Sequence, residues 1–235
     1  VQTAKIRRFE RALVRVADAT AAVSAADAAA LRALAPEARL AVVPNGVDLD
    51  HYAPADPGAV VSTRCVFTGK MDFRPNIDAA VWLCERVWPR VRAARPDAAL
   101  DLVGRDPAPR VARLADPAAG VAVTGAVPDT RPFLAQAGVV LVPLRVGGGT
   151  RLKVLEAMAM AKAMVATTLA VEGLDLADGV EARLVDDPEA FAAAVVALMD
   201  DAAARARLGA AARRRAERDY GWPAIVPRMT ALYRA

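Results

Sequence analysis

The stretch GGGTRLKVLEAMA, residues 147–159, follows an apolar strand pattern and opens into an amphipathic helix pattern. Consecutive glycines let the backbone approach an anion without side-chain obstruction, and the first turn of the following helix leaves N–H groups free to donate to it. Lys153 adds a point charge, and the carboxylate of Glu156, one turn after Leu152, can accept both hydroxyls of a ribose. The stretch therefore predicts a phosphate-and-sugar site, with an ordinary glycine-rich turn and a solvated Glu156 as the alternative.

Short strand patterns alternate with helical patterns on both sides of that stretch. Strands are expected over 64–68, 99–103, 121–124, 139–142 and 164–168, and helices over 76–94, 107–115, 129–136 and 150–160. Such alternation implies parallel strands with right-handed crossovers, so we predict an α/β fold with a Rossmann-like, doubly wound parallel sheet. The glycines at 69, 104, 125 and 147–149 all follow strands, and ligands of such sheets bind at that rim.

Further elements flank this alternation. Helices are expected over 2–16, 26–35, 188–200, 202–219 and 223–234, and strands over 19–24 and 40–44, with Ser24 as a helix cap. Apolar residues at helical spacing predict the packing faces: Ile6, Phe9, Leu13 and Val16 in the first helix, Leu152, Leu155 and Ala159 after the glycines, and Ile225, Met229, Leu232 and Tyr233 in the last helix. The helix from Asn76 carries an apolar stripe that includes Trp88, which predicts a packing helix rather than a site.

Composition narrows the class of protein. The chain has 235 residues, 55% of them hydrophobic with few aromatics, which suits an alanine-rich α/β protein with a substantial core. It has no uncharged apolar run of about 18 residues and a charged N-terminal stretch, so we expect neither a membrane span nor a signal peptide. The net charge is +4, but the only basic run, Arg213–Arg215, is expected to be a solvated helix face rather than a nucleic-acid patch. Cys65 and Cys84 lack metal-site spacing and are expected to be reduced core residues of a cytosolic protein.

Several motifs along the chain share one resemblance. PNGVD at 44–48 resembles an interdomain junction, FTGKMDFRPN at 67–76 resembles a first strand with its glycine turn, and 102–104 and 123–129 resemble the ends of the next two strands. Together with 147–159, they are similar in order and spacing to the retaining glycosyltransferases of family 4. The GT-B fold of that family pairs two Rossmann-like domains around a nucleotide-sugar cleft.

The resemblance implies a domain organisation and an activity. It makes 1–44 a remnant of the N-terminal, acceptor-side domain, 45–60 the interdomain junction, 61–220 the nucleotide-sugar-binding domain and 221–235 a C-terminal crossover helix. The implied reaction moves a sugar, with retention, from a nucleotide-diphospho-sugar to a glycan or lipid-linked acceptor. Without the rest of the N-terminal domain, the fragment is expected to be inactive. The implied location is cytoplasmic, with peripheral contact to the inner membrane.

The resemblance also assigns site residues. Lys153 and Arg74 are the expected catalytic charges, which neutralise the leaving diphosphate, although loop solvation is an alternative for Arg74. The expected donor-binding residues are Gly69, Lys70, Gly104, Val127, Gly148, Gly149, Thr150, Arg151, Leu152 and Glu156. No metal or other cofactor is expected, because lysine and arginine can supply the positive charge. Asp129 is placed either to contact the edge of the nucleotide base or to cap a helix, and we favour the cap. His51 is not expected to act as a general base, because nothing near it in the sequence would orient its side chain.

The chain departs from the family pattern at two places. The family commonly has two glutamates separated by seven residues, and the earlier one falls on Gly148 here. After the helix, Ala161 and Ala163 replace the usual glycine and proline, which predicts a strained helix end. The GGGTRLK segment resembles a subgroup linked to exopolysaccharide and exosortase loci. A non-catalytic nucleotide-binding domain and a sugar-nucleotide epimerase of GT-B fold remain alternatives.

Overall fold

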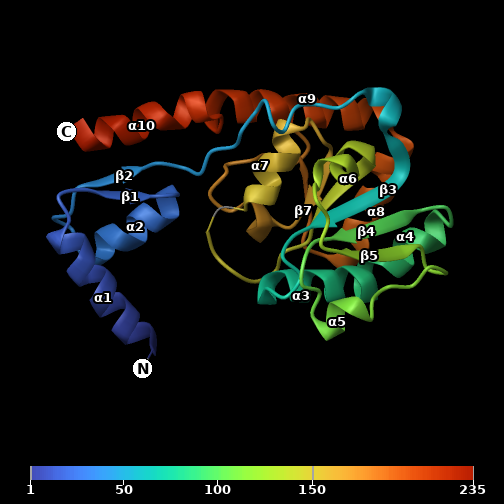
Figure 1. The fold of residues 1–235 in the computed structure, drawn as a ribbon, viewed down its shortest axis with the longest axis horizontal. Helices are drawn as coiled ribbons and strands as arrows, with labels where there is room; N and C mark the ends of the chain where they lie inside the picture. Colours follow the sequence, from blue (N-terminus) through green and yellow to red (C-terminus); the bar gives the residue numbers. More distant parts are fainter. Residues whose placement is uncertain (1, 150, 235) are drawn as a thin grey trace.

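A computed structural model describes residues 2–149 and 151–234. Their strands form two separate sheets (Figure 1). The larger sheet has six strands in the order β5-β4-β3-β6-β7-β8, and every pairing within it is parallel. Its strands are β3 (Val61–Thr68), β4 (Ala99–Val103), β5 (Val121–Gly125), β6 (Ala137–Val142), β7 (Met164–Ala166) and β8 (Arg183–Leu184). The predicted doubly wound α/β fold is thereby confirmed, with β8 as an additional strand.

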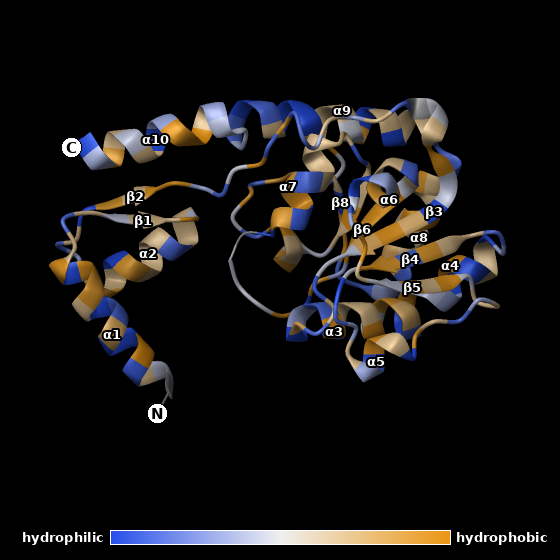
Figure 2. Ribbon diagram, in the orientation of Figure 1, coloured by the Kyte–Doolittle hydropathy of each residue, from blue (hydrophilic) through white to orange (hydrophobic). Residues whose placement is uncertain are grey.

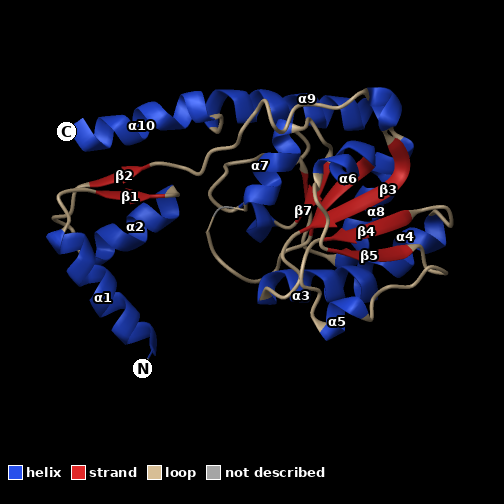
Figure 3. Cartoon of the chain, viewed as in Figure 1, coloured by secondary structure: helices blue, strands red, loops and turns tan. Residues whose placement is uncertain are grey.

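The strand order reverses at β3, which pairs with β4 on one side and with β6 on the other. Cys65 lies opposite Leu100 in β4 and Val139 in β6. Figure 3 shows helices on both faces of this sheet. A reversal of strand order opens a crevice beyond the carboxyl ends of the two central strands, so the fold places the candidate site between the β3 and β6 ends.

Helices connect and cover these strands. They are α3 (Arg74–Trp82), α4 (Trp88–Ala94), α5 (Pro109–Ala112), α6 (Arg131–Gln136), α7 (Leu152–Ala159), α8 (Pro188–Asp200), α9 (Ala202–Asp219) and α10 (Trp222–Arg234). Short 3-10 turns cover Pro57–Ala59 and Thr168–Val171. The prediction of one helix over 76–94 needs correction, because a π-helical turn at Leu83–Val87 separates α3 from α4. Pro89 has no N–H to donate, and the turn places it in the first turn of α4, where none is needed.

Figure 2 shows that the strands of the large sheet are mostly hydrophobic, and their buried side chains form one core with those of the covering helices. Trp88 is buried as expected, and its indole Nε1 donates to the carbonyl of Ala119 at 2.8 Å. Cys65 lies in the core and Cys84 packs against it, and burial raises the pKa of both thiols. Among the described residues, no helix is both long and apolar enough to cross a membrane.

The smaller sheet belongs to the N-terminal part. It pairs β1 (Thr20–Ala22) with β2 (Leu40–Val42) in parallel, beside α1 (Gln2–Val16) and α2 (Ala25–Leu34). Ser24 caps α2 as predicted, since its hydroxyl oxygen accepts the N–H of Asp27 at 3.0 Å. The prediction that Ile6, Phe9, Leu13 and Val16 pack in a core is wrong in this structure, where all four are exposed. Two strands and one neighbouring helix offer too little apolar surface to cover that face.

The chain passes between the two sheets twice, through residues 43–60 and at Gly221 (Figure 1). The crossings touch, because the N–H of Val47 donates to the carbonyl of Tyr220 at 2.8 Å. A Cβ on Gly46 would lie 2.7 Å from the Trp222 ring, and one on Gly221 would lie 2.5 Å from Leu49. Close contact therefore favours glycine at position 46, under the rigid Trp222 ring, more strongly than at position 221, where the Leu49 side chain can move.

The helix end after α7 has the predicted strain. Ala161 adopts a φ of 53°, in the left-handed region that favours glycine. A Cβ added to Gly209 of α9 would lie only 2.0 Å from the carbonyl oxygen of Ala161. The backbone of α9 therefore packs directly against this helix end. In α10, Ile225 is buried as expected of the apolar face, whereas Tyr233 of the same face is 84% exposed.

Candidate functional site

A cavity of about 600 Å³ opens at the reversal of strand order. The ends of β3 and β4, the segment after β5, the glycine loop and the first turns of α3 and α7 form its walls. The lining residues are Tyr52, Thr68, Gly69, Lys70, Phe73, Pro75, Asn76, Val103, Gly104, Arg105, Ala126, Val127, Thr130, Leu144, Gly147, Gly148, Arg151, Leu152, Lys153 and Glu156. Four of them are Lys or Arg and one is a carboxylate, so an anion is favoured there.

Most of the predicted site residues line this cavity. These are Gly69, Lys70, Gly104, Val127, Gly148, Arg151, Leu152, Lys153 and Glu156. Gly149 lies next to the lining residues without being one of them, and Thr150 lies outside the described residues. Arg74 is exposed and does not line the cavity, although its neighbours Phe73 and Pro75 do. Leu152 is also 53% exposed, so the prediction that it packs inward is wrong, while Leu155 and Ala159 are buried.

Two glycines form the floor of the cavity by close backbone contact. Gly104 has a φ of 154°, and a Cβ there would lie 1.7 Å from the carbonyl oxygen of Gly69. The N–H of Gly69 in turn donates to the carbonyl of Val103 at 3.0 Å. A side chain at position 104 is therefore excluded, and the backbone stays accessible to a ligand.

Lys153 lies in the first turn of α7 and is half-buried. Its Nζ donates to Oδ1 of Asn76 at 2.8 Å and lies 4.3 Å from the centre of the Phe67 ring. Burial lowers the pKa of this ammonium to about 7, although the negative charge of Glu156 acts in the opposite direction. Among the described residues, the Lys153 amine has no ion-pair partner, and its contact with Asn76 holds it at the cavity wall.

Glu156 lies one turn further along α7. Its Oε1 accepts a hydrogen bond from the hydroxyl of Tyr52 at 3.2 Å. Burial raises the pKa of the Glu156 carboxyl, and the Tyr52 hydrogen bond and the Lys153 charge lower it. Glu156 lies half-buried on the cavity wall.

Arg151 holds the glycine loop in shape. Its guanidinium donates to the carbonyls of Gly147, Gly148 and Gly149. These bonds fix the conformation of the loop, whose Gly147 and Gly148 line the cavity. Lys70 forms an ion pair with Asp72 at 3.0 Å and stays half-exposed.

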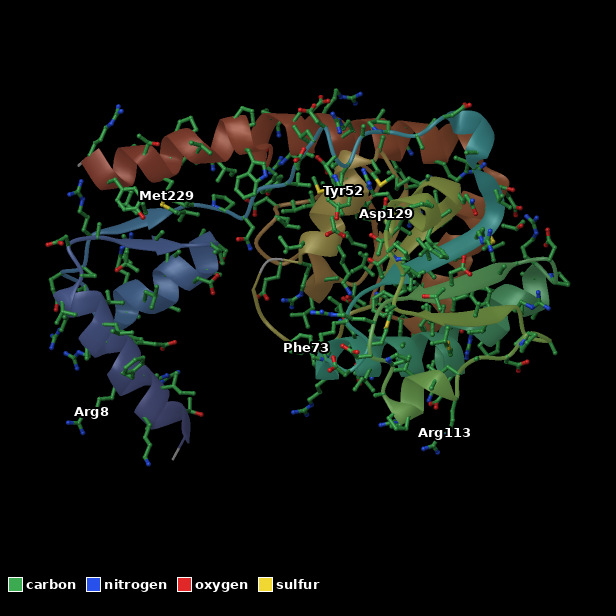
Figure 4. All side chains as sticks on the ribbon, viewed as in Figure 1. Arg8, Tyr52, Phe73, Arg113, Asp129 and Met229 are labelled. Atoms are coloured by element: carbon green, nitrogen blue, oxygen red, sulfur yellow. The ribbon has the colours of Figure 1, made fainter. Side chains whose placement is uncertain are left out.

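Asp129 and His51 lie near the cavity entrance. The carboxylate of Asp129 accepts the N–H of Arg131 at 2.9 Å and pairs with its guanidinium. Thr130 is the N-cap residue of α6. Asp129 lies one position before it and accepts the N–H of the first helical residue, Arg131. His51 contributes its backbone carbonyl, which accepts from Arg131 at 3.1 Å. Figure 4 labels Tyr52 and Asp129, both beside the site.

Sequence reasoning missed four contributors. Asn76 belongs to the helix predicted to be purely for packing, yet its side chain is 6% exposed and bonds Lys153. Tyr52 reaches Glu156 across 104 positions of sequence. Arg105 lines the cavity beside Gly104. Arg213 was predicted to be solvated, but it donates to the carbonyls of Leu49, Tyr52 and Ala159 at 2.6–3.2 Å.

A doubly wound sheet with a glycine-lined, electropositive cavity at its switch point defines a Rossmann-like domain of the nucleotide-binding type. The chain belongs to the family described as Glycosyl transferases group 1, which matches residues 62–201. Residues 2–51 match the family described as Glycosyltransferase Family 4. Within the GT-B fold of these enzymes, the six-stranded part corresponds to the C-terminal domain.

Curated relatives match along most of the chain. The phosphatidyl-myo-inositol mannosyltransferase of Mycolicibacterium smegmatis is 32% identical over 199 residues, covering 81% of this chain and 50% of that protein. The D-inositol 3-phosphate glycosyltransferase of Kineococcus radiotolerans is 33% identical over 236 residues, covering 84% and 52%. The chain therefore spans about half the length of the curated relatives that it matches.

Solved structures share the fold. TarM of S. aureus superposes with a TM-score of 0.83 at 15% identity, covering 98% of this chain and 46% of that one. Anabaena HepE, solved with UDP and glucose, gives a TM-score of 0.77 at 16% identity, covering 97% and 67%.

Proposed function

We propose that this chain is the donor-binding part of a retaining glycosyltransferase that uses a nucleotide-diphospho-sugar. The observation that carries the proposal is the convergence of the Gly147–Gly149 loop, Lys153 and Glu156 on one cavity at the sheet's switch point. The loop backbone and Lys153 suit a diphosphate, and Glu156 suits the hydroxyls of a ribose. Val127 and the adjacent backbone lie where the base would be held.

The chemistry that these residues support is stabilisation of a leaving diphosphate. Negative charge develops on the donor phosphates as the glycosidic bond breaks, and cations held in a partly desolvated site stabilise it. Lys153 supplies that charge inside the cavity, and Arg74 supplies it from the exposed first turn of α3. Glu156 is the only carboxylate among the described lining residues, and ribose binding is its proposed task. We propose that the reaction needs no metal.

The position of the family's first glutamate is open here. A Cβ on Gly148 would meet nothing within 4 Å, so the loop leaves space at the sugar-binding end of the cavity. We propose that backbone N–H groups of the loop take over the contacts to the sugar.

The acceptor is proposed from the relatives. Their names include mannosyltransferases of phosphatidyl-inositol lipids and a glycosyltransferase of inositol phosphate. We infer a glycan or lipid-linked acceptor, peripheral contact at the cytoplasmic face of the membrane, and a role in polysaccharide assembly such as the exopolysaccharide-linked subgroup. The proposed organisation is 1–44 as part of the acceptor-side domain, 45–60 as junction, 61–220 as donor domain and 221–235 as crossover helix.

The test is binding by calorimetry to UDP, GDP and ADP, with the corresponding nucleosides and nucleotide sugars as comparisons. Saturable binding of one diphosphate, stronger than its nucleoside, is expected. The fragment alone is expected to transfer no sugar, because the cleft needs both domains to hold the acceptor and exclude water. Failure of all three diphosphates to bind would overturn the proposal. Binding by a full-length protein that never turns over would favour the nucleotide-sensing alternative.

A further inference from the structure

Among the described side chains of the junction, residues 45–60, Tyr52 is the one that lines the cavity. Its hydroxyl donates to Oε1 of Glu156 at 3.2 Å. Each carboxylate oxygen has two lone pairs, so Glu156 keeps acceptor capacity for ligand hydroxyls while Tyr52 is bound. The contact joins a segment outside the large sheet to the residue proposed to hold the ribose.

The backbone around Tyr52 is fixed to the same helix that carries Glu156. The Arg213 guanidinium donates to the carbonyl of Tyr52 at 3.1 Å and to that of Ala159, the last residue of α7, at 2.6 Å. The N–H of Tyr52 donates to the carbonyl of Asp48 at 2.9 Å. Since these bonds do not involve the phenol hydroxyl, the ring should keep its place when the hydroxyl is removed.

We propose that Tyr52 is a positioning residue for ribose recognition: its hydroxyl holds the Glu156 carboxylate in one orientation. The inference rests on the proposed function of the site and adds to it a residue from the junction. A carboxylate that accepts a fixed donor loses rotational freedom before the ligand arrives, which lowers the cost of binding.

The contact also has an electrostatic consequence. Burial raises the pKa of Glu156, and the hydrogen bond from Tyr52 lowers it. The groups that act on this carboxyl are Tyr52, Lys153 and His51, and Asp129 and Arg131 act on the Tyr52 hydroxyl from the α6 side. Removing the hydroxyl should therefore raise the pKa of Glu156 further, so that the carboxylate is protonated, and ribose binding is lost, at a higher pH.

The experiment measures the affinity of UDP and GDP from pH 4.5 to 8 for wild type and Tyr52→Phe. We expect Tyr52→Phe to weaken binding at pH 7 by roughly three- to tenfold. We also expect the acid side of its pH profile to move to higher pH and its preference for ribose over 2′-deoxyribose to shrink. In a Glu156→Gln background, Tyr52→Phe should have little effect.

Tyr220→Phe is the matched control, because it removes a buried hydroxyl that donates to the carbonyl of Leu174 at 2.8 Å, away from the cavity. It should lower the melting temperature without moving the pH profile. Tighter binding by Tyr52→Phe, or an unchanged acid side, would overturn the inference while the proposed function stands. Absence of UDP and GDP binding by wild type would overturn both.

Discussion

We expect Lys153 to link nucleotide binding to the uptake of a proton. Its ammonium has a pKa of about 7 in the free site, against an ordinary value of 10.5, so at pH 7 about half of the molecules carry the charge. A diphosphate placed beside the amine raises its pKa and completes protonation. Binding should therefore take up about half a proton at pH 7 and about 0.9 of a proton at pH 8. The affinity should fall by up to about tenfold per pH unit above 7, because the amine must first gain a proton.

The assay is titration calorimetry with UDP and GDP in buffers of different ionisation enthalpy, which reports the protons exchanged. Near pH 8 the phosphate itself exchanges little, since its second pKa is about 6. Lys153→Arg keeps the charge at every pH and should bind without proton uptake, while Lys153→Met should bind weakly and without uptake. Equal uptake by wild type and Lys153→Met would refute the assignment of Lys153 to the phosphates.

The same pKa predicts a stability effect. Between pH 7 and 10.5 the unfolded chain binds more protons at Lys153 than the folded protein does, so this residue makes stability rise with pH over that range. Lys153→Met should remove that part of the pH dependence in denaturant unfolding.

Four further substitutions test the site and its scaffold. Glu156→Gln should cost on the order of 1.5–3 kcal/mol of ribonucleotide binding and abolish discrimination against the 2′-deoxy analogue, measured by calorimetry; an undiminished ribose preference would argue against the assignment. Ala161→Gly should stabilise the fold by about 1 kcal/mol in denaturant unfolding, because it relieves a left-handed alanine; a loss of stability would show that the corner is unstrained. Gly104→Ala should destabilise the fold by more than about 3 kcal/mol, whereas Gly148→Ala, which meets open space, should melt like wild type.

The sequence predicted the elements whose periodicity is long and regular. The alternation of strands and helices after residue 60, and the glycines at the strand ends, together place the rim of the sheet. β8 was missed because its two residues, Arg183 and Leu184, are too few to show a period. The π-helical turn before Pro89 was missed because an apolar stripe continues across it.

Most of the predicted site residues that line the cavity lie on α7 or at the ends of strands. Their positions could be predicted because they depend on the spacing of nearby residues in the sequence. Tyr52 and Arg213 could not be predicted, because their contacts join segments more than 100 residues apart and depend on how α9 packs. Asn76 carried a usable signal: a polar side chain in the first turn of a helix that directly follows a glycine turn. Arg74, predicted from resemblance, lies at the start of α3, but its exposed side chain is not among those that line the cavity.

The paired crossings at Val47 and Gly221 restrict how the two sheets can move relative to each other. Two parts joined by a single chain segment can rotate relative to each other about several axes. Two connections bonded side by side resist twisting more than one connection does. The Trp222 ring lies over Gly46 and the Leu49 side chain lies over Gly221, so a side chain added at either glycine would press against one of them. Such a residue is expected to shift the two crossings and, with them, the distance between the cavity and the smaller sheet.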